Sequence, residues 1–254
     1  MAVSHDVAYR GGVPVRQTSG AGGMMSARFG IEAVTDVWCQ AGRYMATFAS
    51  WNQDPQVSSY AEMVGTLCLA QVPEADRLLA TDPFALLTGM LLDQQFPMER
   101  AFAGPHILAE RLGDPMRLDP AVIMGMDEEV LKSAAAGPPA IHRYPSSMVA
   151  RIQQVATVVC NEYDGDAANL WLSAKSGLSV RKNLKQLPGF GDQKASIFIA
   201  LLGKQIGYRP TGWRAASAPY GGVKTYMSVA DVVDAQSLAK VRAYKKQKKV
   251  ASRA

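Results

Sequence analysis

The chain has 254 residues, 48% of them hydrophobic, which is enough apolar content for the core of one large domain or two small ones. Its formal net charge is +5 and its sequence pI is about 9.1, a balance that favours a polyanionic partner. No apolar run approaches the roughly 18 residues of a membrane span, and the N-terminus lacks the pattern of a signal peptide. We therefore expect a cytoplasmic protein with no membrane partner.

The three cysteines, Cys39, Cys68 and Cys160, are far apart in the sequence. None of them has the spacing of a disulfide pair or of a zinc finger. We expect a reduced environment, no metal site and no cofactor.

Residues 1–62 differ in composition from the rest, because Gly, Ser, Gln and scattered charges dominate, as in the run from Gln17 to Gly23. Such a composition predicts a mostly disordered leader, followed by a folded domain over residues 63–254. Met63 is an alternative translation start under this hypothesis.

Helical patterns dominate from Pro73 onward, strand-like alternation is nearly absent, and no internal repeat of fixed period occurs. The sequence therefore predicts an all-α fold. The expected helices cover residues 74–79, 83 up to Pro97, 98–112, a short stretch after Asp119, 128–136, 145 to about 163, a short helix with Trp171 and Leu172, two helices flanking residues 187–191, and a last helix from about Val229. Residues 207–227 are expected to be irregular.

The helix after Asp82 has the clearest signals. Asp82 is a good N-cap, and Pro83 stands at the first helical position, where a missing N–H has no consequence. Apolar residues from Phe84 to Leu92 cover nearly the whole circumference, which predicts a central buried helix.

The stretch from Leu187 to Ala195 reads Leu-Pro-Gly-Phe-Gly-Asp-Gln-Lys-Ala. Pro188 presets φ, and Gly189 and Gly191 permit backbone angles that other residues avoid. The pattern predicts a helix, a tight turn and a second helix whose bare N-terminus offers unpaired N–H groups, as in many phosphate sites.

This stretch resembles the helix-hairpin-helix of DNA repair proteins. The upstream run from Asp82 to Leu87, ending Met90-Leu91-Leu92-Asp93-Gln94-Gln95, resembles the early helix of the helix-hairpin-helix base-excision DNA glycosylases. The resemblance covers residues 66–206 and, more weakly, 207–254. It implies two helical lobes with a DNA-binding cleft between them, and a monomer that acts near the nucleoid on double-stranded DNA with a damaged or mismatched base. The iron–sulfur cluster of some relatives is excluded, because no cysteine follows Cys160.

The resemblance also implies roles for individual residues. Backbone N–H groups near Gly189, Gly191 and Gln193 would hold a phosphate, and Lys194 would add a point charge. Gln95, with Gln94 beside it, matches the glutamine that projects into the DNA, where an amide can both donate to and accept from an orphaned base.

The catalytic groups depart from the family pattern. Members with lyase activity carry a lysine where this chain has Gln193, and Lys194 lies about 100° further round the helix. A Schiff-base lyase is therefore disfavoured, and the expected activity is that of a monofunctional DNA N-glycosylase, a hydrolase.

The family also places an aspartate soon after the hairpin's second helix, where it stabilises positive charge on the sugar. Here residues 195–230 contain no acid, so Asp231 is the first candidate and Asp234 the alternative. The alternative is that Asp231 has no catalytic role and lies in the first turn of the last helix, where the helix dipole favours an acid. In that case the protein is a non-catalytic helix-hairpin-helix DNA-binding protein. A third reading is a protein-interaction scaffold.

Other residues leave two readings open. His142 precedes a helix and either touches DNA or packs internally. Tyr208, Trp213 and Tyr220 either stack on a flipped base or belong to the core. The basic end, from Lys240 to Arg253, is either a phosphate-binding stripe or a solvated helix end.

Overall fold

A computed structural model describes Tyr60 and residues 65–251, which all belong to one compact unit, Asp54–Ala254. The predicted disordered leader and the candidate start Met63 lie outside the described residues, with one exception. Tyr60 is buried in the core, and its ring centroid lies 6.0 Å from that of Trp171.

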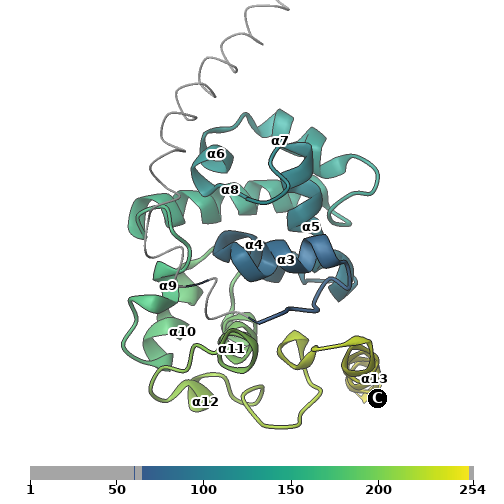
Figure 1. The fold of residues 1–254 in the computed structure, drawn as a ribbon, viewed down its shortest axis with the longest axis vertical. Coiled ribbons are helices and arrows are strands. Elements are labelled where there is room, and N and C mark those ends of the chain that lie inside the picture. The colour runs from purple at the N-terminus through teal and green to yellow at the C-terminus, as the bar shows by residue number, and fades with distance from the viewer. Residues whose placement is uncertain (1–59, 61–64, 252–254) are drawn as a thin grey trace, which may run out of the picture. The chain divides into compact units, whose positions relative to one another are not determined.

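The described part is mostly helical and contains no strand, only an isolated bridge between Ser176 and Thr211. The prediction of an all-α fold is thereby confirmed (Figure 1). The elements are α3 (Pro73–Thr81), α4 (Pro83–Leu92), α5 (Met98–Arg111), α6 (Pro120–Gly125), α7 (Glu128–Ala136), α8 (Pro145–Glu162), α9 (Asn169–Leu172), α10 (Gly177–Gln186), α11 (Asp192–Leu201), the π-helix η1 (Leu202–Ile206), α12 (Trp213–Ala216), the 3₁₀ turn η2 (Val229–Asp231) and α13 (Ala235–Ala251). None of these helices has the length and apolarity needed to cross a membrane.

The N-cap of α4 explains why this helix begins where it does. One carboxylate oxygen of Asp82 accepts the backbone N–H groups of Phe84 and Ala85, at 2.8 and 2.9 Å. The other accepts the N–H of Leu118 at 2.6 Å, so the same side chain also fixes the loop before α6. Every residue from Phe84 to Leu92 is buried, as expected for a central helix.

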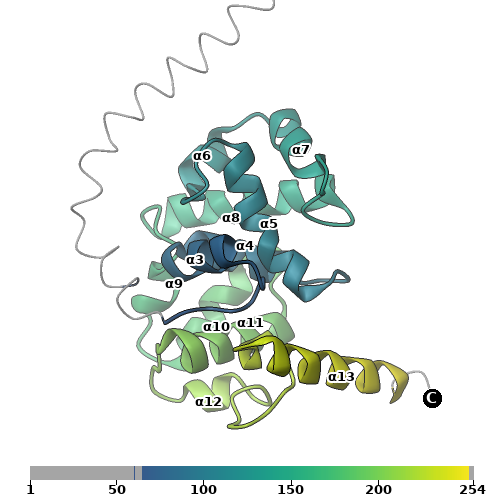
Figure 2. The same cartoon turned by 45° about the vertical axis from the view of Figure 1, so that its right-hand side comes forward.

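The helices pack in recognisable groups within one continuous core. Helices α3, α4 and α5 pack on one another, and α6 and α7 pack on α8. Helix α10 packs on α11 and α12, and η2 packs against α11 and α13. Helix α13 extends beyond the other helices toward the C-terminus, at the right of Figure 2.

The hairpin joins α10 to α11, and its two glycines differ. Gly189 has φ +83°, and a Cβ there would lie 2.7 Å from Leu91 Cδ1. Gly191, the N-cap of α11, has φ −83° and ψ −179°, which any residue adopts, and a Cβ there would meet nothing within 4 Å. The prediction of special backbone angles is therefore right for Gly189 and wrong for Gly191.

The prediction of one last helix from Val229 is also wrong in detail. Val229–Asp231 form the 3₁₀ turn η2, and α13 begins only at Ala235. The stretch expected to be irregular contains a helical turn, α12.

Candidate nucleic-acid interface

The structure brings the two predicted DNA-binding stretches into direct contact. Lys194, in the first turn of α11, donates a hydrogen bond from Nζ to the carbonyl oxygen of Leu91 near the end of α4, at 2.8 Å. The turn residue Gly189 packs on the Leu91 side chain. The hairpin and the loop that follows α4 therefore form one continuous piece of the surface.

The tip of the hairpin is exposed. Gly189, Gly191 and Gln193 are exposed, as is Asp192 between them. Asp192 forms ion pairs with Lys185 at 2.8 Å and Arg181 at 3.1 Å, both on α10. The hydrogen bond from Lys185 is the main cause that holds the pKa of Asp192 below its ordinary value. The acid at the start of α11 is thus balanced by two neighbouring cations.

Lys194 faces the protein. Burial lowers the pKa of its ammonium group to about 8, an effect that the nearby carboxylate of Asp93 partly opposes. Its Nζ also lies 5.6 Å from the centre of the Phe190 ring. In this arrangement the amine satisfies a carbonyl at the end of α4, and its contact with a DNA phosphate remains a prediction.

The two glutamines after α4 differ in their surroundings. The backbone carbonyl oxygen of Gln94 lies 3.0 Å from His142 Nε2. The side-chain nitrogen Nε2 of Gln94 lies 3.1 Å from the sulfur of Met148. Gln95 is exposed and has φ +53°. The structure therefore presents Gln95 on the surface and holds Gln94 inward, as the predicted role of Gln95 requires.

The buried side chain of His142 holds this loop through its contact with Gln94. The backbone N–H of Tyr144 donates to His142 Nδ1 at 3.0 Å, so Nδ1 must carry a lone pair and Nε2 the hydrogen that Gln94 accepts. The ring is 2% exposed and packs against Phe96, with ring centroids 4.9 Å apart. Of the two readings of His142, the structure supports internal packing.

Helix α13 lies against the same loop. Arg242 pairs with Glu99 at 2.5 Å, and Lys245 Nζ lies 3.6 Å from the Asp93 carboxylate. These contacts bring the basic C-terminal helix beside the residues that carry Gln95. They were not foreseen from the sequence, because they join stretches that are far apart along the chain.

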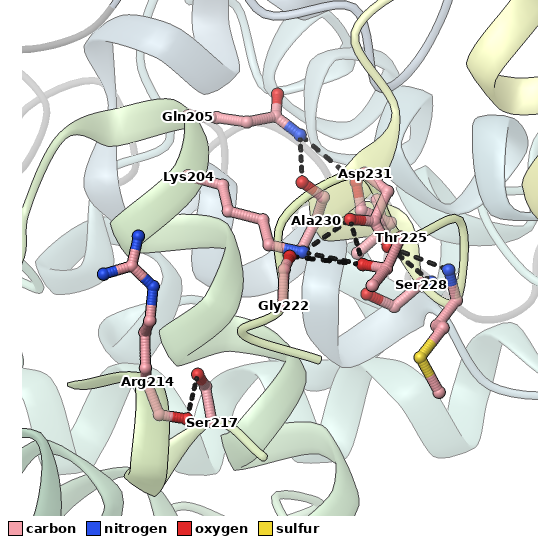
Figure 3. Close-up of polar contacts among 11 residues, drawn as sticks. Lys204, Gln205, Arg214, Ser217, Gly222, Thr225, Ser228, Ala230 and Asp231 are labelled. Atoms are coloured by element: carbon pink, nitrogen blue, oxygen red, sulfur yellow. Dashed lines mark hydrogen bonds and ion pairs between the residues drawn. The ribbon is translucent and has the colours of Figure 1, made fainter. Parts of the chain in front are cut away.

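Both candidate catalytic carboxylates are engaged by the protein itself, and Figure 3 shows the contacts of one of them, Asp231. Asp231 pairs with Lys204 Nζ at 2.5 Å and accepts the Thr225 hydroxyl at 3.0 Å. Its other oxygen accepts the N–H groups of Met227 and Ser228, and the side chain is only 4% exposed. A fully satisfied carboxylate of this kind stabilises the turn in which it lies.

Asp234 starts α13. Its carboxylate accepts the backbone N–H of Ser237 at 2.6 Å, a bond that holds the pKa of Asp234 below its ordinary value. The structure thus separates the two acids that the sequence placed in one helix, and gives each the role of a helix-start cap.

The aromatic candidates pack internally. Trp213 and Tyr220 are 7% and 6% exposed, and the Tyr208 hydroxyl donates to the carbonyl of Ala174 at 3.0 Å. A Cβ at Gly203 would overlap the indole of Trp213, which shows how closely that ring lies on η1.

Comparison of the chain with models of known protein families, with curated proteins and with solved structures gave no match.

Proposed function

We propose that this protein recognises duplex DNA that carries a damaged or mispaired base, through an exposed surface made of Gly189, Gly191, Gln193 and Gln95. We call it the hairpin–loop surface. The observation that carries the proposal is the direct contact between the hairpin and the end of α4 through Lys194 and Leu91. This contact connects the N-terminus of α11, which we expect to bind a phosphate, to the loop that carries the exposed side chain of Gln95.

Gly191 gives the proposal its second support. Its backbone angles suit any residue, and a side chain there would meet no protein atom. The packing of the described chain therefore gives no reason for a glycine. Close approach of a phosphate to the N–H groups of α11 would supply one.

The test compares Gly191→Ala and Gly191→Asp with wild type. Aspartate is a better N-cap than glycine, so this variant should gain or keep stability while its side chain and charge obstruct the phosphate. We expect affinity for intact and mismatched duplexes to fall together, by about tenfold or more for Gly191→Asp, because phosphate contacts carry no sequence information. Fluorescence anisotropy with labelled duplexes measures both affinities.

Gly125 supplies the matched control, since a Cβ at this exposed glycine would also meet nothing within 4 Å. Gly125→Asp should leave duplex binding unchanged. Equal affinities for Gly191→Asp, Gly125→Asp and wild type would remove the hairpin from the DNA interface.

The proposal extends to catalysis through the resemblance to monofunctional DNA glycosylases, with two helical lobes around a DNA-binding cleft. In that form the protein hydrolyses the N-glycosidic bond of the displaced base. Asp231, or Asp234 in its place, supplies the anion that a cationic sugar requires.

A second candidate, a non-catalytic protein that binds the lesion, is favoured by a specific observation. Asp231 is already paired with Lys204, whose positive charge opposes the stabilisation of a cation. Release of free base from a lesion-containing duplex distinguishes the two candidates.

A further inference from the structure

A cavity of about 330 Å³ lies at the end of the α11–η1 helix opposite the hairpin. Its walls come from η1, α12, the glycine-rich stretch around Gly221 and Gly222, and η2. Lys204 and Gln205, which both line it, reach from η1 to η2 and contact Asp231 and Ala230 there (Figure 3). A volume of this size is in the range of small-molecule sites.

The lining of the cavity is strongly basic. Residues 195–230 contain four basic residues and no acid, and all four line this cavity: Lys204, Arg209, Arg214 and Lys224. The one acid in the lining is Asp231, which pairs with Lys204. Three formal positive charges therefore remain without a carboxylate in the cavity.

Each of these three cations has its charged end available. Arg209 uses Nε to donate to the Gly203 carbonyl at 2.8 Å, which leaves its two terminal nitrogens. The Arg214 guanidinium lies 4.7 Å from the centre of the Trp213 ring. Across residues 65–251, neither Arg214 nor Lys224 forms an ion pair, and both are exposed.

We propose that this cavity binds the phosphate group of a nucleotide. Like charges that line one concavity repel each other and concentrate an anion there. Guanidinium groups bind phosphate with two parallel hydrogen bonds, and three cations suit a doubly charged phosphate monoester better than a single carboxylate. At the rim, Val223 is 74% exposed, Val233 61% and Tyr226 38%, which offers apolar contact to a base.

The cavity is distinct from the hairpin–loop surface. Lys204 follows Gln193 by eleven positions in the helix that α11 and η1 form, so the two lie about 16 Å apart along its axis at 1.5 Å per residue. Its net positive charge would destabilise a developing sugar cation, so it suits an anion better than the transition state of glycosidic cleavage. The inference does not depend on duplex recognition by the hairpin–loop surface, but it competes with a catalytic role for Asp231, which lines the same cavity.

The probe is thymidine 5′-monophosphate, titrated calorimetrically into the full chain without duplex DNA. We expect thymidine, which lacks the phosphate, to bind at least tenfold more weakly. Arg214→Gln and Lys224→Gln should each weaken nucleotide binding about tenfold, the effect of losing one charge-assisted hydrogen bond. Both side chains are exposed, so the variants should fold.

Arg143→Gln is the matched control, because the Arg143 guanidinium also lies over an aromatic ring, 5.5 Å from the centre of Tyr144, but is not part of the cavity lining. It should bind like wild type, and so should Gly191→Asp. Equal binding of thymidine and its monophosphate, or unchanged binding in both Arg214→Gln and Lys224→Gln, would overturn the proposal.

The same phosphate can belong to a free nucleotide or to the end of a DNA strand. A 5′-phosphorylated oligonucleotide and its 5′-hydroxyl twin separate these sources. Tighter binding of the phosphorylated strand than of the mononucleotide, with loss in Arg214→Gln, assigns the site to strand ends. The reverse order, with the same loss, assigns it to free nucleotides.

Discussion

At the scale of single residues, the backbone of Gln95 is consistent with the proposed role of its side chain. Its φ of +53° lies in the left-handed region, which costs an ordinary L-residue about 1–2 kcal/mol. Its exposed side chain forms no hydrogen bond with the described part of the chain that would explain the conformation. Strain of this kind is typical of sites where a side chain must be presented to a partner.

We predict opposite effects of Gln95→Gly on stability and on recognition. Glycine relieves the strain but adds freedom to the unfolded chain, so the free energy of unfolding should rise by a net of roughly 0.5–1 kcal/mol. The preference for mismatched over intact duplex should fall, because no amide reaches the orphaned base. Urea denaturation and competitive anisotropy measure the two quantities.

Lys224 provides the control for Gln95, since its φ is +56° and it is also exposed. Lys224→Gly should bring a similar gain in stability with no change in the preference for mismatched duplex. Unaltered preference in Gln95→Gly as well would contradict a role for Gln95.

Lys194 makes stability depend on pH in a definite direction. Its pKa in the folded protein is about 8, below the ordinary value of 10.5. Between these two values the unfolded chain holds a proton that the folded protein has lost, so the free energy of unfolding rises with pH. Below about pH 8 both states are protonated and this dependence vanishes.

The comparison is with Lys194→Met, which fills similar space without the amine. The difference in unfolding free energy between wild type and variant should shift in favour of wild type by up to about 3 kcal/mol from pH 8 to pH 10.5. Urea titrations at several pH values give this difference. A difference independent of pH would show that the amine is not desolvated.

At the scale of elements, local signals predicted some boundaries well and others badly. The Asp82-Pro83 start of α4 and the Gly189 turn depend on neighbouring residues, so the sequence was sufficient. The start of α13 was misplaced because two caps follow each other, Asp231 with Ser228 and Asp234 with Ser237. Each cap closes a separate turn, and the sequence pattern does not show that the helix is interrupted between them.

The basic residues of helix α13 can be tested for binding to DNA. Its buried residues are Ser237, Leu238 and Val241, so the turns after Val241 contribute little to the core. If Lys246 and Lys248 contact phosphates, changing both to Gln should flatten the slope of log K against log salt by about two units for duplex DNA. Thermal stability should stay within about 0.5 kcal/mol, as for most exposed substitutions.

The same change at Lys175 and Lys182, which are exposed on the chain before and within α10, serves as the control and should leave the slope unaltered. An unchanged slope in the α13 variant would identify this end as a solvated helix. Both outcomes are read from titrations at several salt concentrations.

At the scale of the whole molecule, the contacts that organise the candidate site are long-range. The hydrogen bond from Lys194 to Leu91 joins residues 103 positions apart, and the one between Arg242 and Glu99 spans 143 positions. Helical periodicity reports only on neighbours three or four residues away. The sequence therefore identifies the two stretches that we propose bind DNA, but not the contact that joins them, nor the pair of Lys204 with Asp231.

That pair decides the last prediction, which concerns chemistry. If Asp231 stabilises a sugar cation, Asp231→Asn should abolish release of free base while sparing duplex binding. Lys204→Gln should then retain or raise the release rate, because it removes an opposing charge beside the carboxylate. If Asp231 only closes its turn, Asp231→Asn and Lys204→Gln should each lose about 3 kcal/mol of stability, because each breaks the buried Lys204–Asp231 pair. Neither variant should then change base release selectively.

The substrates are duplexes with uracil, alkylated, oxidised or mismatched bases, and Asp234→Asn is the control for the alternative carboxylate. Borohydride should trap no covalent adduct, because the resemblance to the glycosylases places Gln193 where members with lyase activity carry a lysine. A trapped adduct would show that another amine attacks the sugar. Tight binding to a lesion without base release by the wild type would favour the non-catalytic candidate, since the Asp231 carboxylate would then remain bound to Lys204 throughout.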